Sequence, residues 1–297
     1  MMDRLHRRDF LRIGGGALAS AALGGAAAAD EQAKKRTLHK AIMYGTLTFK
    51  GSVLDQFRAV KAAGFEGVEP MSHMNQDEVL KAFDDTGLKA ASCCCSTHWG
   101  KPLSHPDENI RQEAREGVEQ ALKDAKRYGA TSVLLVPGVV NKDVSYDDCF
   151  RRSVIEIKRI LPLAHDLDVK LAIENVWNDF ITKPEQALDF LAAIDSPMVG
   201  WHFDIGNVLR YGKPEEWIPK IGKRILKLHI KEWKKLAPKN GFAVRLLEGD
   251  DNWPAIMKAL DDIGYSGWGI SEQPGEQSKD SDALKDLSER MDKVFAS

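Results

Sequence analysis

From residue 39 to its end, the chain alternates between short apolar segments and longer segments with helical periodicity. Eight short segments are each followed by one helix-like segment. Several of the short segments are apolar on both faces, which is typical of parallel strands that helices cover. Regular alternation of this kind predicts βαβ units and therefore an α/β fold built on a parallel sheet.

Eight such units favour the (β/α)8 TIM barrel over a doubly wound sheet. A TIM barrel typically has ~250 residues, which is close to the length of this chain. Four of the helix-like segments are followed by a glycine, the residue that best adopts the left-handed conformation of a helix cap. These glycines are Gly64, Gly87, Gly129 and Gly264. No linker divides the chain, so we predict a single domain over residues 30–297. The expected strands are 39–46, 65–70, 89–96, 131–138, 169–175, 198–204, 225–233 and 268–273, and the expected helices are 52–63, 75–86, 108–128, 147–167, 184–194, 214–222, 252–263 and a closing helix.

Residues 1–29 differ from the rest of the chain in composition. The paired Arg7 and Arg8 precede a stretch rich in glycine and alanine, and small residues stand before Asp30. This segment resembles a twin-arginine export signal that is cleaved after Ala29. A membrane anchor is the alternative, but the apolar stretch is shorter than the ~20 residues that a spanning helix needs. We therefore expect export of the folded protein to the periplasm or another extracytoplasmic space, with no membrane contact after cleavage.

The charge of the chain argues against nucleic-acid binding, and the position of its cysteines argues against a disulfide framework. The chain has a formal net charge of -2, and removal of the arginine-rich residues 1–29 leaves a more acidic remainder. An acidic protein does not favour a nucleic-acid partner, since binding to phosphates requires basic side chains. Cys93, Cys94 and Cys95 are consecutive within an apolar segment, so we interpret them as buried small residues and not as a disulfide framework.

Residues with metal-binding side chains stand at or near the ends of the last four expected strands. They are Glu174, Asp204, His229 and Glu272. In a TIM barrel, the carboxyl ends of the strands form one rim and carry the active site. Three carboxylates and one imidazole favour a hard divalent cation, with Mn²⁺ preferred over Mg²⁺, Co²⁺ or Zn²⁺. Each residue alone has an ordinary structural explanation, such as a capped turn or a packed histidine, but their joint occurrence predicts one metal ion.

Short motifs around these residues point to a known family. The motifs AIENVWNDF, HFDIGN, KLHIKEW and ISEQ occur in this order, together with FEGVEP and THWGKPLSHPD nearer the start. Their order and spacing resemble the sugar phosphate isomerase/epimerase family, the xylose isomerase-like barrels that include ketose 3-epimerases. The resemblance covers nearly all of residues 30–297. It implies that the four residues bind one divalent metal ion and that Glu174 and Glu272 are the catalytic acid and base. Ketose 3-epimerases often have a histidine where this chain has Asn207, which argues against that subgroup.

The residues suit the chemistry that the resemblance implies. A metal ion can stabilise the negative charge of an enediolate, and a carboxylate can take the proton from the carbon beside a carbonyl. Return of the proton to the opposite face gives epimerisation, and return to the neighbouring carbon gives isomerisation. Further residues at strand ends or in the following loops are candidates for binding the sugar. They are Glu69, His98, Trp99, Asn175, Trp177, His202, Asn207, Lys231 and Glu248.

We therefore predict a metal-dependent isomerase or epimerase with a small carbohydrate as its partner, and we leave an oligomer open. Because phosphorylated sugars are intracellular, the expected export favours an unphosphorylated keto sugar or keto-glycoside. The same residues could support a 3-keto-glycoside lyase or hydrolase. A non-catalytic sugar-binding protein is a further alternative. An endonuclease of the abasic-site type would need more histidines at the strand ends and a basic groove, neither of which the sequence provides.

Overall fold

The computed structural model describes residues 36–297, which lie within one compact unit, Lys34–Ser297. The expected export signal at residues 1–29 lies outside the described residues. Among the helices that the structure describes, none is both long and apolar enough to cross a bilayer.

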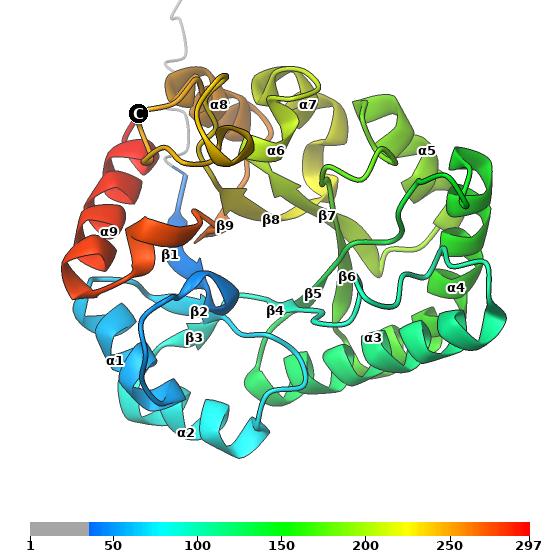
Figure 1. Cartoon of the computed structure of the whole chain (residues 1–297), viewed down its shortest axis with the longest axis horizontal. Coiled ribbons are helices and arrows are strands. Elements are labelled where there is room, and N and C mark those ends of the chain that lie inside the picture. The colour runs from blue at the N-terminus through cyan, green and yellow to red at the C-terminus, as the bar shows by residue number, and fades with distance from the viewer. Residues whose placement is uncertain (1–35) are drawn as a thin grey trace, which may run out of the picture. The chain divides into compact units, whose positions relative to one another are not determined.

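The strands form one parallel sheet that curves into a barrel, with the helices on its outer side (Figure 1). The order of the strands in the sheet is β3-β2-β1-β9-β8-β7-β6-β5-β4. Their bounds are β1 (Leu38–Met43), β2 (Gly67–Glu69), β3 (Lys89–Ala90), β4 (Cys93–Cys94), β5 (Ser132–Leu135), β6 (Lys170–Glu174), β7 (Val199–Asp204), β8 (Ile225–Ile230) and β9 (Gly267–Ser271).

The third expected strand, residues 89–96, is divided into β3 and β4 in the structure. The β3 strand pairs with β2, and β4 pairs with β5, so one chain segment connects the two ends of the sheet. The backbone N–H of Cys94 donates to the carbonyl of Pro70 at 2.9 Å, which continues the pairing beyond β2. The two pieces therefore act as one barrel strand, and the predicted (β/α)8 barrel is confirmed.

A helix follows each barrel strand, close to where the sequence predicts it. The α-helices are α1 (Val53–Ala62), α2 (Gln76–Thr86), α3 (Glu108–Tyr128), α4 (Tyr146–Leu167), α5 (Pro184–Ile194), α6 (Ile205–Val208), α7 (Pro214–Ile221), α8 (Trp253–Asp262) and α9 (Ser281–Phe295). The 3-10 helices are η1 (Tyr44–Thr46), η2 (Gly222–Arg224), η3 (Lys239–Gly241) and η4 (Gly275–Ser278). Gly87 and Gly129 cap α2 and α3 with φ angles of 69° and 78°, as their positions in the sequence predict. The one-turn helix α6 was not expected.

The alternation of side chains along the strands separates an apolar layer from a polar barrel interior. On β7, Trp201 and Phe203 are fully buried in the main core, which lies between the sheet and the helices. His202 and Asp204 alternate with them and therefore point to the opposite face. There they lie near His229 of β8, whose ring centroid is 4.1 Å from that of His202. The fold thus directs polar side chains of neighbouring strands into the barrel.

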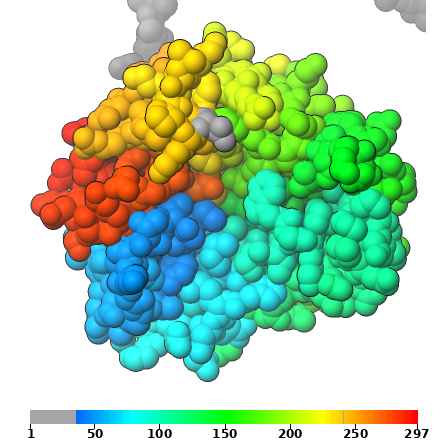
Figure 2. All heavy atoms as spheres, in the orientation of Figure 1, coloured from blue at the N-terminus to red at the C-terminus, as the bar shows by residue number. Residues whose placement is uncertain are grey.

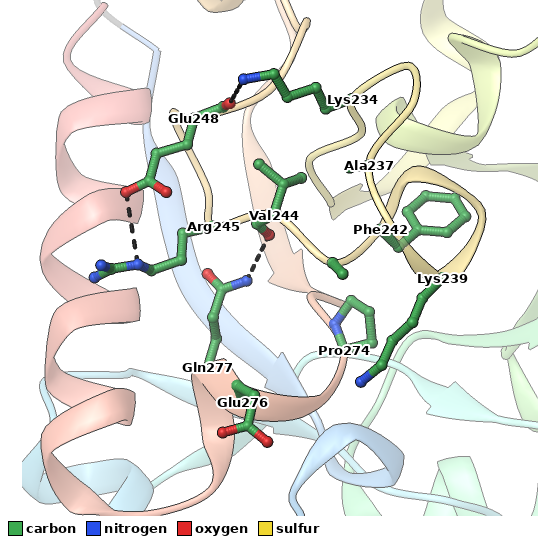
Figure 3. A pocket seen from close by; sticks show the side chains of 11 residues that line it. Lys234, Ala237, Lys239, Phe242, Val244, Arg245, Glu248, Pro274, Glu276 and Gln277 are labelled. Atoms are coloured by element: carbon green, nitrogen blue, oxygen red, sulfur yellow. Dashed lines mark hydrogen bonds and ion pairs between the residues drawn. The ribbon is translucent and has the colours of Figure 1, made fainter.

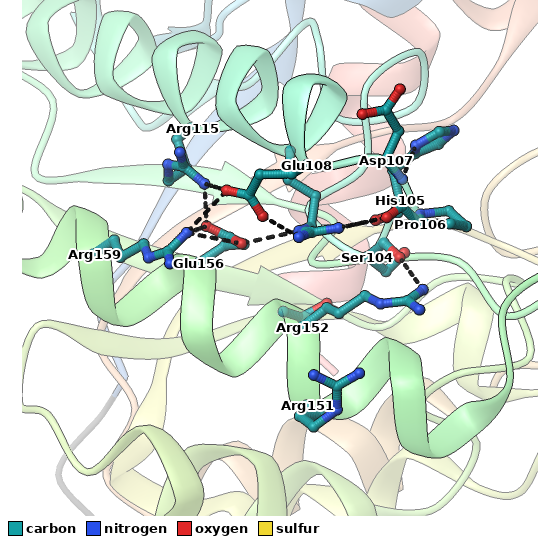
Figure 4. Close-up of polar contacts among 12 residues, drawn as sticks. Ser104, His105, Pro106, Asp107, Glu108, Arg115, Arg151, Arg152, Glu156 and Arg159 are labelled. Atoms are coloured by element: carbon teal, nitrogen blue, oxygen red, sulfur yellow. Dashed lines mark hydrogen bonds and ion pairs between the residues drawn. The ribbon is translucent and has the colours of Figure 1, made fainter.

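Ion pairs join α3 to α4 on the outer side of the barrel (Figure 4). Glu156 of α4 is their centre, and its side chain is only 2% exposed. It accepts from the Arg111 guanidinium at 3.0 Å and from Arg159 at 3.1 Å, and it also contacts Arg115. A buried carboxylate is stable only with such partners, so Glu156 and its arginines stabilise the packing of these two helices as a unit.

We expect Glu156→Gln to lower the free energy of unfolding by about 3 kcal/mol, because it leaves partly buried arginines without their shared carboxylate. Urea unfolding of the purified variant measures this loss. The matched control is Arg159→Gln, which removes the half-exposed partner and should cost less than ~1 kcal/mol. Equal losses in the two variants would contradict a central role for Glu156.

Candidate active site

The four residues expected to bind a metal converge inside the barrel mouth. Glu174 ends β6, Asp204 ends β7, His229 lies on β8, and Glu272 directly follows β9. Their ligand atoms all lie within 4.8 Å of one another. The Nδ1 atom of His229 is 2.9 Å from Oε1 of Glu174, 3.2 Å from Oε2 of Glu272 and 3.9 Å from Oδ2 of Asp204. The imidazole is therefore the point where the three carboxylates meet.

Burial of these charges changes their pKa values. Burial raises the pKa of Asp204 well above its usual range, and burial also raises the pKa of Glu174. Although burial acts in the same direction on Glu272, the charges of Lys231 and His229 hold its pKa well below the ordinary value. The Nζ atom of Lys231 lies 2.9 Å from Oε2 of Glu272 and 3.4 Å from Oδ2 of Asp204. Three acids packed this closely require positive charge, which Lys231 supplies in part.

The donor set fits a hard divalent cation. Three carboxylate oxygens and one imidazole nitrogen are ligands that Mn²⁺, Mg²⁺, Co²⁺ and Zn²⁺ accept. Ligand atoms bound at ~2.0–2.6 Å from a common ion are necessarily neighbours at about the spacing seen here. Within the described part of the chain, this is the larger of two groups of potential ligands, the other being Glu69, His202 and His229. The residues present therefore form a possible metal site.

Asn175 and Asn207 hold the Asp204 end of the site in place. The side-chain oxygen of Asn175 accepts from the Asp204 backbone N–H at 3.1 Å, and its amide donates to the Asp204 carbonyl at 2.8 Å. Asp204 also caps α6, because its Oδ1 accepts from the backbone N–H of Asn207 at 2.7 Å. The Asn207 amide in turn donates to the Asn175 carbonyl at 3.1 Å. The side chain of Asn175, which the sequence analysis expects to bind substrate, thus bonds to the Asp204 backbone, and its oxygen also accepts from the Trp201 indole at 3.0 Å.

A cavity of about 220 Å³ opens beside the acidic cluster. Of the sequence candidates, both glutamates of the cluster and five further residues line it. The complete lining is Met43, Cys94, His98, Trp99, Leu134, Glu174, Val176, Trp177, Asn207, Lys231, Phe242 and Glu272. Figure 2 shows this face of the molecule, with the loop between β8 and α8, in yellow, beside the hollow at the barrel mouth. A small ligand in this cavity would lie against both Glu174 and Glu272.

His98 offers a neutral imidazole to this cavity. Burial lowers the pKa of His98 to about 4, so the ring is uncharged at neutral pH. Its Nδ1 accepts from the backbone N–H of Val136 at 3.3 Å, which leaves the proton on Nε2. His98 can therefore donate one hydrogen bond to an oxygen of a ligand without adding charge.

Five residues of the lining were missed by the sequence analysis: the apolar Met43, Leu134 and Val176, together with Phe242 and Cys94. Phe242 comes from the loop between β8 and α8, where no local pattern marks it. Its ring lies 4.5 Å from Nζ of Lys231 and 4.8 Å from the ring of Trp177, so it forms a wall of the cavity. Cys94 was interpreted only as a buried residue. It ends β4, and the rule that selects strand ends could have found it.

Glu69 and His202 lie beneath the site instead of lining it. Both side chains are fully buried, and neither is among the residues that line the cavity. Oε2 of Glu69 is 3.1 Å from Nε2 of His229. Because Nδ1 of His229 faces the acids while Nε2 faces Glu69, this contact fixes the orientation of the ring. Glu248 lies elsewhere again, in a separate pocket, where it pairs with Arg245 and Arg290.

We expect Glu69→Gln to weaken metal binding by about 10–100-fold, because partners that orient a histidine ligand typically contribute that much to metal affinity. Titration of the purified protein with Mn²⁺ by calorimetry measures this change. Glu66→Gln is the matched control, since Glu66 is half-exposed and pairs with His39 outside the site. Unchanged affinity in Glu69→Gln would show that the carboxylate does not support His229.

Comparisons with known proteins identify the family of this chain. Residues 57–294 match the family model described as xylose isomerase-like TIM barrel. Among curated proteins, L-ribulose-5-phosphate 3-epimerase UlaE of Escherichia coli (strain SE11) is 25% identical over 242 residues, which cover 76% of this chain and 84% of the relative.

Solved structures show the same fold at lower identity. D-allulose 3-epimerase from Methylomonas sp. matches with a TM-score of 0.71 and 16% identity, covering 88% of this chain and 97% of that one. The 3-keto-D-glucoside 4-epimerase YcjR of E. coli matches with a TM-score of 0.75 and 15% identity, covering 88% of this chain and 100% of that one. The IOLI protein, solved with a bound zinc atom, matches with a TM-score of 0.75 and 17% identity, covering 87% of this chain and 98% of that one. The chain belongs to the xylose isomerase-like TIM barrel family.

Proposed function

We propose that the protein is a metal-dependent sugar epimerase or isomerase that acts on a keto sugar through an enediolate. The observation that carries this proposal is the position of Glu174 and Glu272. Both belong to the possible metal site, and both line the same cavity. Three of the named relatives are epimerases, which favours proton transfer over the cleavage of a glycosidic bond as the reaction.

Glu174, Asp204, His229 and Glu272 would hold the metal ion, for which we propose Mn²⁺. When bound, a divalent cation polarises a carbonyl and stabilises negative charge on the neighbouring oxygen. Glu174 and Glu272 extend from β6 and from the end of β9, so they reach the cavity from different strands. One takes the proton from the carbon beside the carbonyl, and the other returns it to the opposite face. Lys231, held 2.9 Å from Glu272, stabilises the ionised form of that carboxylate.

We propose an unphosphorylated substrate. Lys231 is the one lysine or arginine that lines the cavity among the described residues, and two carboxylates already bind it. Apart from the proposed metal ion, a phosphate in this cavity would therefore meet no cation that is not already paired with a carboxylate. In this respect the proposal departs from the curated relative, whose name specifies a sugar 5-phosphate.

Proton exchange in D2O tests the function. The protein is loaded with Mn²⁺ and incubated with a panel of free ketoses, ketose phosphates and 3-keto-glycosides, and the products are followed by NMR. Deuterium incorporation beside the carbonyl without bond cleavage is the expected result. Release of an aglycone would instead identify a lyase or hydrolase. Binding of sugar without any exchange would identify a non-catalytic binding protein.

We also propose that residues 1–29 direct export by the twin-arginine route. Replacement of both Arg7 and Arg8 with lysine should retain the protein in the cytoplasm, whereas the unaltered chain should appear in the periplasmic fraction. Cell fractionation with an antibody against the barrel distinguishes the two results. Equal distribution of both forms would contradict the proposed signal.

A further inference from the structure

A second, larger pocket lies beyond the wall that Phe242 forms (Figure 3). We call it the outer pocket. It has a volume of about 460 Å³ and lies between the loop that follows β8 and the residues that follow β9. Phe242 lines both this pocket and the cavity at the acidic cluster. Pro274 of the outer pocket stands two residues after Glu272. The outer pocket is therefore the immediate neighbour of the proposed catalytic centre.

The two spaces differ in size in a way that bears on the substrate. Pockets for drug-sized ligands usually have ~300–1,000 Å³. The inner cavity, at about 220 Å³, lies below that range, whereas the outer pocket, at about 460 Å³, lies within it. A free monosaccharide needs only the inner cavity. A substrate with a second ring would use both.

The lining of the outer pocket suits a neutral sugar ring. Phe242, Val244 and Pro274 give it apolar surfaces against which the C–H face of a ring can pack. Its edge carries both signs of charge, including Lys239 and Glu276. Sugar hydroxyls can accept hydrogen bonds from an ammonium group and donate them to a carboxylate. The lining has three basic side chains, Lys234, Lys239 and Arg245, against the two acidic ones, Glu248 and Glu276, so a sugar phosphate is the competing occupant that the experiment must distinguish.

Lys239 is the side chain best placed to bind such a ring. Figure 3 shows it extending beside Pro274, and no dashed line joins it to the other residues drawn. Among the described residues, no hydrogen bond or ion pair engages its ammonium group. In contrast, Arg245 already pairs with Glu248 and with Asp286. Lys239 therefore has hydrogen-bonding capacity that a ligand could use.

We propose that the substrate is a keto-glycoside whose keto ring occupies the inner cavity and whose second sugar ring packs over Phe242 into the outer pocket. This inference rests on the proposed function, because it assigns the inner cavity to the ring that loses a proton. It specifies the class of substrate, which the family resemblance leaves open between free ketoses, their phosphates and glycosides.

Three substrates test the inference with the Mn²⁺-loaded protein: D-allulose, D-allulose 6-phosphate and 3-ketocellobiose, in which the keto ring carries a second glucose. The kcat/KM for proton exchange in D2O should be highest for 3-ketocellobiose. Lys239→Ala should lower kcat/KM for this disaccharide about tenfold, as loss of a charge-assisted hydrogen bond predicts, and leave that for D-allulose unchanged. Ala243→Trp, which fills the outer pocket, should have the same selective effect.

Lys235→Ala is the matched control, because Lys235 is an exposed lysine of the same loop that does not line the outer pocket. Equal efficiency with D-allulose and 3-ketocellobiose, or no selective loss in the two pocket variants, would overturn the inference while leaving epimerisation intact. If no substrate exchanges its proton, the proposed function fails instead. Calorimetry with the exchange-deficient Glu174→Gln variant then decides the inference, which requires tighter binding of 3-ketocellobiose than of D-allulose.

Discussion

Replacement of Glu174 or Glu272 with glutamine is expected to lower the rate of proton exchange by about 10²–10⁴-fold, the usual contribution of a general base. Glutamine keeps the size of the side chain and one carbonyl oxygen but cannot accept and return a proton. Both residues line the inner cavity, and neither can replace the other if the proton is removed and returned on opposite faces. Each single variant should therefore be nearly inactive.

The measurement compares exchange in D2O with metal content determined by mass spectrometry. Because the remaining oxygen and the other three ligands are retained, both variants should keep part of their metal. Glu185→Gln is a suitable control, since Glu185 pairs with Lys220 on the surface and should retain normal exchange. Near-normal exchange in Glu174→Gln would refute its role, whatever the metal content.

Loss of both exchange and metal in the two variants has a different meaning. The carboxylates would then be needed chiefly as ligands, and a proton acceptor would have to be sought among other residues of the lining. His98 would not supply it directly, because its Nδ1 already accepts from the backbone N–H of Val136 and its Nε2 carries the proton. The double measurement therefore separates the two roles that the family resemblance assigns to the same side chains.

The elements of the barrel could be predicted from the sequence because local patterns define them. Strands apolar on both faces, amphipathic helices and capping glycines are each visible over a few residues. The convergence of the four acidic and histidine side chains also follows from a simple rule, since parallel strands bring their carboxyl ends to one rim. This rule does not predict how deep within the barrel each side chain lies.

Glu69 and His202 illustrate that limit. Alternation along a strand places His202 on the same face as Asp204, and both indeed point into the barrel. His202 stands two residues earlier on β7, however, and therefore lies deeper, where both of its ring nitrogens are buried without a hydrogen-bond partner among the described residues. The carboxylate of Glu69 contacts the ring of His229, which stands 160 residues later in the sequence. Such a contact depends on tertiary packing and has no local signal.

The loop between β8 and α8 could not be predicted for a related reason. Its path is set by the buried Glu232, whose carboxylate accepts from the backbone N–H groups of Leu247 and Asp251 at 2.8 and 3.1 Å. It also accepts from the indole of Trp253 at 2.8 Å. These bonds hold the C-terminal part of the loop, while the Gln273 amide donates to the carbonyls of Phe242 and Val244 at 3.5 and 2.7 Å. No periodicity in the sequence predicts a loop conformation that depends on hydrogen bonds to one buried carboxylate.

Asp204→Ala and His229→Ala are expected to abolish metal retention and, as a consequence, proton exchange. The loss of affinity should exceed the ~10–100-fold expected for Glu69→Gln, because these variants remove a ligand and not its support. His229 is the nitrogen donor of the cluster and touches all three acids, so its loss also leaves buried carboxylates without a partner. Asp204→Ala additionally removes the cap of α6.

Because both variants can also lose stability, their folding must be checked before metal binding is measured. Circular dichroism and thermal unfolding serve this purpose, and Asn207→Ala is a control that alters α6 and the contact with Lys231 while keeping all four proposed ligands. The expected result is a folded barrel that binds Mn²⁺ in Asn207→Ala but not in His229→Ala. Stoichiometric, tightly bound metal in a folded His229→Ala protein would show that the ion is held elsewhere, and the assignment of both glutamates as metal-linked proton carriers would fail with it.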